Sequence, residues 1–149
     1  MSCLAAGENP DSRFAGIWQL FMFSSDAVSK TEDGKIVIDQ TKIQPANSFK
    51  IFAQDGKLTN IQLRKDDDAI AKILISEGSY TFSGDGTGFV ESFTFHTYAP
   101  LIGDSISHKT EFVGEDCYYT TFEVSGAGYQ EIWKRFNVVP TTTASPNGN

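Results

Sequence analysis

The sequence predicts an all-β protein, folded as an up-and-down antiparallel barrel of eight to ten strands. Runs rich in aromatic and β-branched residues are separated by turn residues at intervals of about 8–12 residues, the spacing of all-β folds. Segments with helical periodicity are nearly absent. The 12 Phe, 5 Tyr and 2 Trp residues suit the half-buried surface of a pleated sheet.

The predicted strands follow one another along the chain with short connections. They cover residues 14–24, 35–38, 48–53, 57–64, 71–77, 79–83, 88–98, 105–113, 117–124 and 129–138. Gln54-Asp55-Gly56 is a hairpin loop with Gly where a positive φ is expected. Gly78 separates two runs, and a Gly in that position is typical of a bulge or a barrel corner.

Short connections make consecutive strands antiparallel neighbours. A sheet of this many strands tends to curl and close, which also removes its exposed edges, so a barrel is favoured over a sandwich. The interior of such a barrel is either filled by side chains or just wide enough for one small ligand.

The chain reads as one domain. The barrel is expected over residues 14–138, because no linker or repeat interrupts the strand pattern. Residues 1–13 lack periodicity and are expected to be extended or disordered. The Pro-, Thr- and Asn-rich residues 139–149 are expected to form a disordered tail.

Charge and hydropathy exclude several partners. The formal net charge is -7, and the 12 Lys and Arg residues are scattered, which disfavours nucleic acid and anionic membrane surfaces. No window reaches the roughly 18 apolar residues of a spanning helix. Residues 1–9 also lack the basic and apolar regions of a signal peptide.

The two cysteines do not decide in which cellular compartment the protein resides. Cys3 and Cys117 are either free thiols, a disulfide, or a free Cys117 with Cys3 as the lipidated first residue of a processed lipoprotein. Export to the periplasm or cell envelope is favoured by the low Lys content and polar tail, and a cytoplasmic location is the alternative.

Residues at both ends of the predicted barrel resemble those of lipocalins and related calycins. These families open the first strand with Gly-x-Trp and carry a basic residue on the last strand, as do Gly16-Ile17-Trp18 and Arg135 here. The middle of the chain, with Glu91 and His96, resembles an uncharacterised lipocalin-like domain family of Bacteroidetes. The resemblance implies a closed barrel with a central cup. It implies no particular activity, because the family has none assigned.

Trp18 and Arg135 are predicted to form the structural floor of the barrel. A guanidinium group lies flat on an indole ring and donates hydrogen bonds to carbonyl groups at strand ends. A direct ligand contact by either residue is the alternative.

Glu91 and His96 lie five residues apart on one predicted strand, so strand alternation places them on opposite faces. Glu91 shares its face with Phe93 and Phe95, and we expect this face inside. A buried carboxylate needs a partner, for which Lys109, Arg135 and a ligand cation are the candidates. If the other face points inward, His96 and Tyr98 line the cup.

Metal, cofactor and catalytic motifs are missing from the pattern. Two histidines and scattered carboxylates do not compose a zinc or facial-triad signature, so neither a metal nor a cofactor is predicted. The sequence also has no Gly-x-Ser-x-Gly elbow and no phosphate-binding loop with a lysine.

The sequence therefore predicts a non-enzymatic protein that binds a small hydrophobic or amphipathic molecule in a barrel cavity. The predicted wall residues are Tyr80, Glu91, Phe93, Phe95, His96, Tyr119 and Trp133. A filled barrel acting as a structural or interaction module of the cell envelope is the first alternative. An enzyme with His96 or Glu91 as general base is the second.

Overall fold

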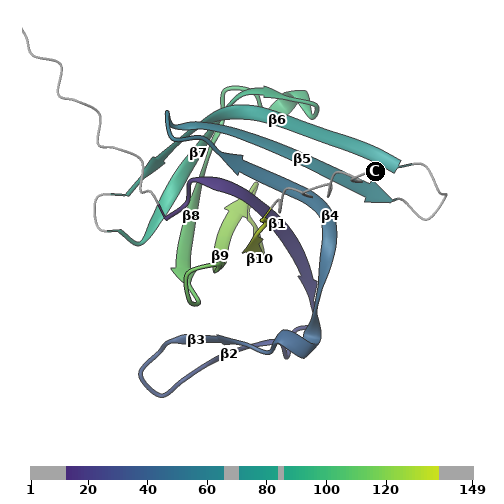
Figure 1. Ribbon diagram of the computed structural model, residues 1–149. Helices are drawn as coiled ribbons and strands as arrows, with labels where there is room; N and C mark the ends of the chain where they lie inside the picture. Colours follow the sequence, from purple (N-terminus) through teal and green to yellow (C-terminus); the bar gives the residue numbers. More distant parts are fainter. Residues whose placement is uncertain (1–12, 66–70, 84–85, 138–149) are drawn as a thin grey trace, which may run out of the picture.

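A closed antiparallel barrel dominates the computed structural model, which describes residues 13–65, 71–83 and 86–137 (Figure 1). Its strands are β1 (Gly16–Phe23), β4 (Ile43–Phe52), β5 (Lys57–Lys65), β6 (Ala71–Phe82), β7 (Gly88–His96), β8 (Ser105–Phe112), β9 (Cys117–Val124) and β10 (Ala127–Arg135). Neighbours along the barrel are neighbours in the chain, and β1 pairs with both β10 and β4 to close it. The predicted all-β up-and-down barrel is confirmed.

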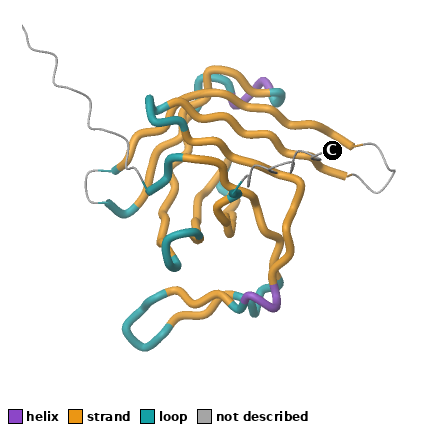
Figure 2. The backbone as a smooth tube through the Cα atoms, viewed as in Figure 1, coloured by secondary structure: helices purple, strands orange, loops and turns teal. Residues whose placement is uncertain are grey.

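A small hairpin interrupts the meander between β1 and β4. It consists of β2 (Val28–Lys30) and β3 (Ile36–Ile38), and the 3-10 helix η1 (Gln40–Lys42) leads from it into β4. The hairpin lies outside the barrel (Figure 1). A second 3-10 helix, η2 (Ala99–Leu101), follows β7, and strands and loops make up the rest of the described chain (Figure 2).

Strand β6 runs unbroken through Gly78, where two separate strands are predicted. Gly78 pairs with Phe93 whereas Glu77 pairs with Phe95, so Thr94 is an extra residue on β7 and forms a bulge. A Cβ atom on Gly78 would lie only 1.7 Å from the carbonyl oxygen of Ser92. The glycine is therefore required by the close approach of β7 at the bulge.

Aromatic side chains fill one end of the barrel and form what we call the aromatic core. Its buried members are Phe14, Trp18, Phe52, Leu58, Tyr80, Phe89, Tyr118 and Trp133. Phe14, in the turn before β1, is central to it. Its ring lies at centroid distances of 4.7 to 5.6 Å from the rings of Phe52, Phe82, Phe89, Phe112 and Tyr118.

Arg135 lies against Trp18, a member of this core, at the closed end of the barrel. The guanidinium carbon of Arg135 is 4.4 Å from the centre of the Trp18 ring. The same guanidinium donates hydrogen bonds to the carbonyl oxygens of Ala15 (2.8 Å) and Arg13 (2.7 Å) and to Asp116 (2.9 Å). The indole nitrogen of Trp18 donates to the carbonyl oxygen of Phe14 at 2.8 Å. These bonds tie the chain before β1 to the last strand.

The hairpin covers part of the outer barrel surface and creates a second apolar cluster. Its buried residues are Ala27, Ile36, Ile38, Ile43, Cys117 and Ile132. Ile132 is fully buried although its neighbour Trp133 faces the interior. Cys117 is a free, buried thiol, and burial raises its pKa to about 11.

The predicted terminal segments, residues 1–13 and 139–149, lie almost wholly outside the described residues, and so does Cys3. Within the described part of the chain, no helix is long and apolar enough to span a membrane.

Candidate functional site

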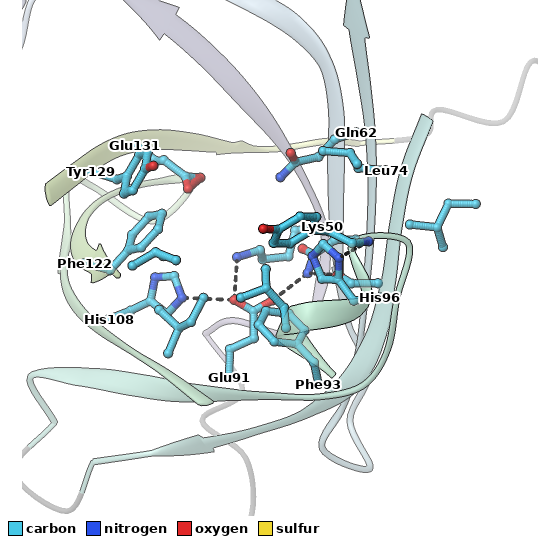
Figure 3. A pocket seen from close by; sticks show the side chains of 17 residues that line it. Lys50, Gln62, Leu74, Glu91, Phe93, His96, His108, Phe122, Tyr129 and Glu131 are labelled. Carbon is cyan, nitrogen blue, oxygen red and sulfur yellow. Dashed lines mark hydrogen bonds and ion pairs between the residues drawn. The ribbon is translucent and has the colours of Figure 1, made fainter. Parts of the chain in front are cut away.

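The half of the barrel opposite the aromatic core contains a cavity of about 480 Å³ (Figure 3). Of the barrel strands, all except β1 contribute described residues to its lining. Apolar walls come mainly from Leu74, Phe93, Leu101, Ile106, Phe122 and Val124. Tyr98 and Tyr129 line the cavity yet are about half exposed, so they mark its mouth.

Five buried polar residues form the bottom of the cavity, and we call them the polar cluster. They are Lys50, Asn60, Ser76, Glu91 and His108, from five consecutive barrel strands. Glu91 is the centre of the cluster. It accepts hydrogen bonds from Asn60 Nδ2 (2.5 Å), His108 Nε2 (2.9 Å) and Lys50 Nζ (3.4 Å).

These contacts keep Glu91 ionised inside the protein. Burial raises the pKa of the Glu91 carboxyl group, but the charge of Lys50 and the hydrogen bonds from His108 and Asn60 lower it more, to about 2. At neutral pH the carboxylate therefore carries a full negative charge and only accepts hydrogen bonds.

Lys50 lies between this carboxylate and the aromatic core. Its ammonium nitrogen is 5.0, 5.6 and 6.0 Å from the ring centres of Trp133, Phe89 and Phe52. A cation over aromatic faces is attracted by their negative π surfaces, most strongly where water is excluded. Lys50 is thus held by charge on one side and by aromatic rings on the other.

Glu91 forms the expected buried pair with a lysine, but this lysine is Lys50, and neither of the two cations named from the sequence, Lys109 and Arg135, reaches it. Lys109 is exposed because its neighbour His108 takes the inward position on β8, and Arg135 belongs to the closed end. Lys50 was missed because it lies between Phe49 and Ile51, which look like the buried pair of that strand. The bulky apolar residues Phe49 and Ile51 in fact alternate with the inward Ser48, Lys50 and Phe52.

His108 is fixed by contacts on both ring nitrogens. Nε2 donates to the ionised Glu91, and Nδ1 lies 3.4 Å from the hydroxyl of Thr120, which donates to it. The imidazole also stacks on Phe89, with ring centres 4.4 Å apart. Burial lowers the pKa of His108, so the ring is neutral at pH 7.

Glu91 and His96 both line the cavity, so the prediction that they face opposite sides is wrong. The bulge at Thr94 reverses the alternation between them. As a result Phe93 and His96 face inward, whereas Phe95 lies outside with 46% of its surface exposed. No hydrogen bond joins Glu91 to His96, whose Nδ1 instead accepts from the backbone N–H of Tyr98 at 2.9 Å.

The other predicted wall residues lie away from the cavity. Tyr80 and Trp133 belong to the aromatic core, where the hydroxyl of Tyr80 donates to the carbonyl oxygen of Ala53 at 2.6 Å. Tyr119 packs against the hairpin on the outer surface, because its neighbour Tyr118 takes the inward position. Of the predicted wall, the structure brings together Glu91, Phe93 and His96.

A metal centre has no obvious ligand set here. Among residues 13–65, 71–83 and 86–137, no group of three or more His, Cys, Asp or Glu side chains is placed to hold a metal ion.

A closed eight-stranded meander with an interior cavity is an all-β, lipocalin-like barrel. A family model described as a domain of unknown function, DUF4488, matches residues 13–144. The chain therefore belongs to the DUF4488 family. No curated protein matches the sequence.

Proposed function

We propose that this protein binds a small hydrophobic or amphipathic molecule in the barrel cavity and does not transform it. The cavity itself carries the proposal: about 480 Å³ lies within the range of small-molecule sites, roughly 300–1,000 Å³. Apolar walls with a few convergent polar groups at the bottom are the usual composition of such sites. The resemblance of Gly16-Ile17-Trp18 and Arg135 to lipocalins supports the same reading.

The arrangement of the polar cluster supports binding over catalysis. A general base needs a free lone pair within reach of the substrate proton. Both nitrogens of His108 are already engaged, by Glu91 and Thr120, and Glu91 already accepts three hydrogen bonds. The cavity volume in turn favours binding over a filled barrel that acts only as an envelope module.

A fluorescent probe tests the proposal without knowledge of the natural ligand. N-phenyl-1-naphthylamine is uncharged, aromatic and emits strongly only in apolar surroundings. We expect saturable binding of one probe per chain. Competitors from a lipid, haem and bile-acid panel that displace the probe, and are recovered unchanged by mass spectrometry, then identify the ligand class.

Two matched substitutions locate the bound probe. Val124 lines the cavity, so Val124→Trp fills part of it and is expected to weaken binding by about tenfold or more. Val37 is exposed on the hairpin, so Val37→Trp makes the same chemical change elsewhere and is expected to leave binding unaltered. Equal affinity of the two variants, or no saturable binding to the unmodified protein, rejects the proposal.

A further inference from the structure

Asn60 offers an unused hydrogen-bond acceptor at the bottom of the cavity. The residue is only 6% exposed and lines the cavity. Its Nδ2 donates to Glu91 Oε1 and to Ser76 Oγ (2.8 Å). Because an ionised carboxylate cannot donate, the nitrogen has to face Glu91, and this fixes the orientation of the amide. Among the described residues, Oδ1 then has no hydrogen-bond partner.

A buried acceptor is costly to leave without a hydrogen bond, and no described group of the protein donates one to Oδ1. A ligand that brings a donor to Oδ1 removes this cost. The binding free energy therefore favours molecules with an O–H or N–H group at the end that enters first.

The charges of the polar cluster oppose a charged ligand end. Lys50 and Glu91 compensate each other, with side chains that are each 4% exposed. His108 and His96 are neutral at pH 7, since burial lowers the pKa of both rings. A ligand carboxylate would place a second negative charge near Glu91, and a ligand ammonium would place a second positive charge near Lys50. Neither charge finds a counter-ion among the five cluster residues, and because the Glu131 carboxylate also lines the cavity (Figure 3), a ligand carboxylate is the more costly of the two to bury.

His96 supplies the complementary donor on the cavity wall. Because its Nδ1 accepts from the N–H of Tyr98, the neutral ring carries its hydrogen on Nε2. No hydrogen bond from His96 Nε2 to a described residue is present. Asn60 Oδ1 and His96 Nε2 are thus an acceptor and a donor in the cavity lining without a partner among the described residues, and a hydroxyl group both donates and accepts.

We infer that the cavity takes an uncharged alcohol, whose hydroxyl group donates a hydrogen bond to Oδ1 of Asn60 while its hydrocarbon part lies against the apolar walls. This inference rests on the proposed function and narrows it. It places fatty-acid carboxylates among the poor ligands.

Four eight-carbon compounds test the inference on the unmodified protein by displacement of N-phenyl-1-naphthylamine. 1-Octanol and 1-methoxyheptane are isomers that differ in the hydroxyl donor, and octanoate and octylammonium carry opposite charges. We expect 1-octanol to bind about fivefold more tightly than 1-methoxyheptane, because only the alcohol donates a hydrogen bond to Oδ1 of Asn60. We expect the affinity of 1-octanol to be at least about tenfold higher than that of octanoate, which meets the carboxylates of Glu91 and Glu131 in the cavity. Binding of the ether or octanoate as tight as that of 1-octanol overturns the inference.

Two variants assign the preference to the amide oxygen. Asn60→Leu keeps a side chain of similar shape but removes the amide oxygen. We expect 1-octanol and 1-methoxyheptane to bind this variant with equal affinity. Ser92→Ala removes a hydroxyl group that bonds Ser105 in an exposed pair outside the cavity lining, so the preference for the alcohol is expected to persist. Persistence of the preference in Asn60→Leu, or its loss in Ser92→Ala, contradicts the assignment. If Asn60→Leu does not fold, the comparison of the four ligands on the unmodified protein decides alone.

The two proposals fail in different ways. If the probe binds and all four compounds displace it without preference, the alcohol inference is wrong and the binding function stands. If the probe does not bind to the unmodified protein, both are wrong.

Discussion

At the level of single residues, the buried pair of Lys50 and Glu91 is the main unexpected feature of the interior. Removing two charges from water is expensive, and their mutual attraction offsets this cost only with additional hydrogen bonds. Asn60 and His108 supply those bonds to the carboxylate, while aromatic rings surround the ammonium group. Each member of the polar cluster therefore depends on the others.

The cluster predicts a strongly non-additive response to substitution. Lys50→Met leaves the Glu91 carboxylate buried without a counter-charge, and we expect it to lower the free energy of unfolding by about 3–5 kcal/mol. Glu91→Gln added to it removes the orphaned charge, so the double variant is expected to be more stable than Lys50→Met alone. Urea denaturation at pH 7 measures both. A double variant less stable than the single one contradicts the coupling.

The candidate site could be predicted from the sequence only in part. Glu91 stands out because a carboxylate among Phe residues needs a partner. Lys50, Asn60 and His108 carry no such local signal, because they meet Glu91 only after five strands have been set side by side. Their register depends on long-range pairing, which no single-strand pattern contains.

At the level of elements, the turn residues of the sequence predicted where most strands lie. They did not predict which side chains of each strand face the barrel interior. Gly-containing turns delimit the strands, and the hairpin loop at Gly56 has the expected positive φ of 85°. The bulge at Thr94 arises from the pairing of β7 with β6, and it reversed the faces of Phe95 and His96. Strand β2 was missed because its three residues are too short to show a period.

Phe14 shows how a single turn residue supports the closed end. We expect Phe14→Ala to lower the free energy of unfolding by about 3–5 kcal/mol, because it leaves a hole among the rings around it. Probe affinity of the folded variant is expected to stay unchanged, since Phe14 does not line the cavity. Phe136→Ala is the matched control, because Phe136 is 40% exposed and its loss is expected to cost less than about 1 kcal/mol. Equal destabilisation by the two substitutions, in urea titrations, argues against Phe14 as the centre of the core.

At the level of the whole molecule, the buried titratable groups predict low stability in acid. The pKa of Glu91 is lowered from 4.5 to about 2, and that of His108 is lowered from 6.5. Below these ordinary values the unfolded chain binds more protons than the folded one, so the free energy of unfolding falls as the pH falls. We expect a first decline below pH 6.5 from His108, and a second between pH 4.5 and about 2 from Glu91.

Urea denaturation at steps from about pH 7.5 to about pH 3 measures this profile. Glu91→Gln cannot ionise at this position, so we expect it to flatten the decline below pH 4.5. A protein whose stability rises on acidification over this range contradicts the assignment of neutral His108 and ionised Glu91.

The separation of the aromatic core from the cavity has a consequence for the evolution of such domains. Side chains that hold the barrel together gather at the closed end, and those that line the cavity gather in the other half, with the polar cluster as the boundary between them. Under the proposed function, mutations at Leu74 or Val124 alter selectivity and leave the aromatic core intact. Relatives with the same scaffold can then differ in their ligands, and the apolar wall of the cavity is the place to begin redesign.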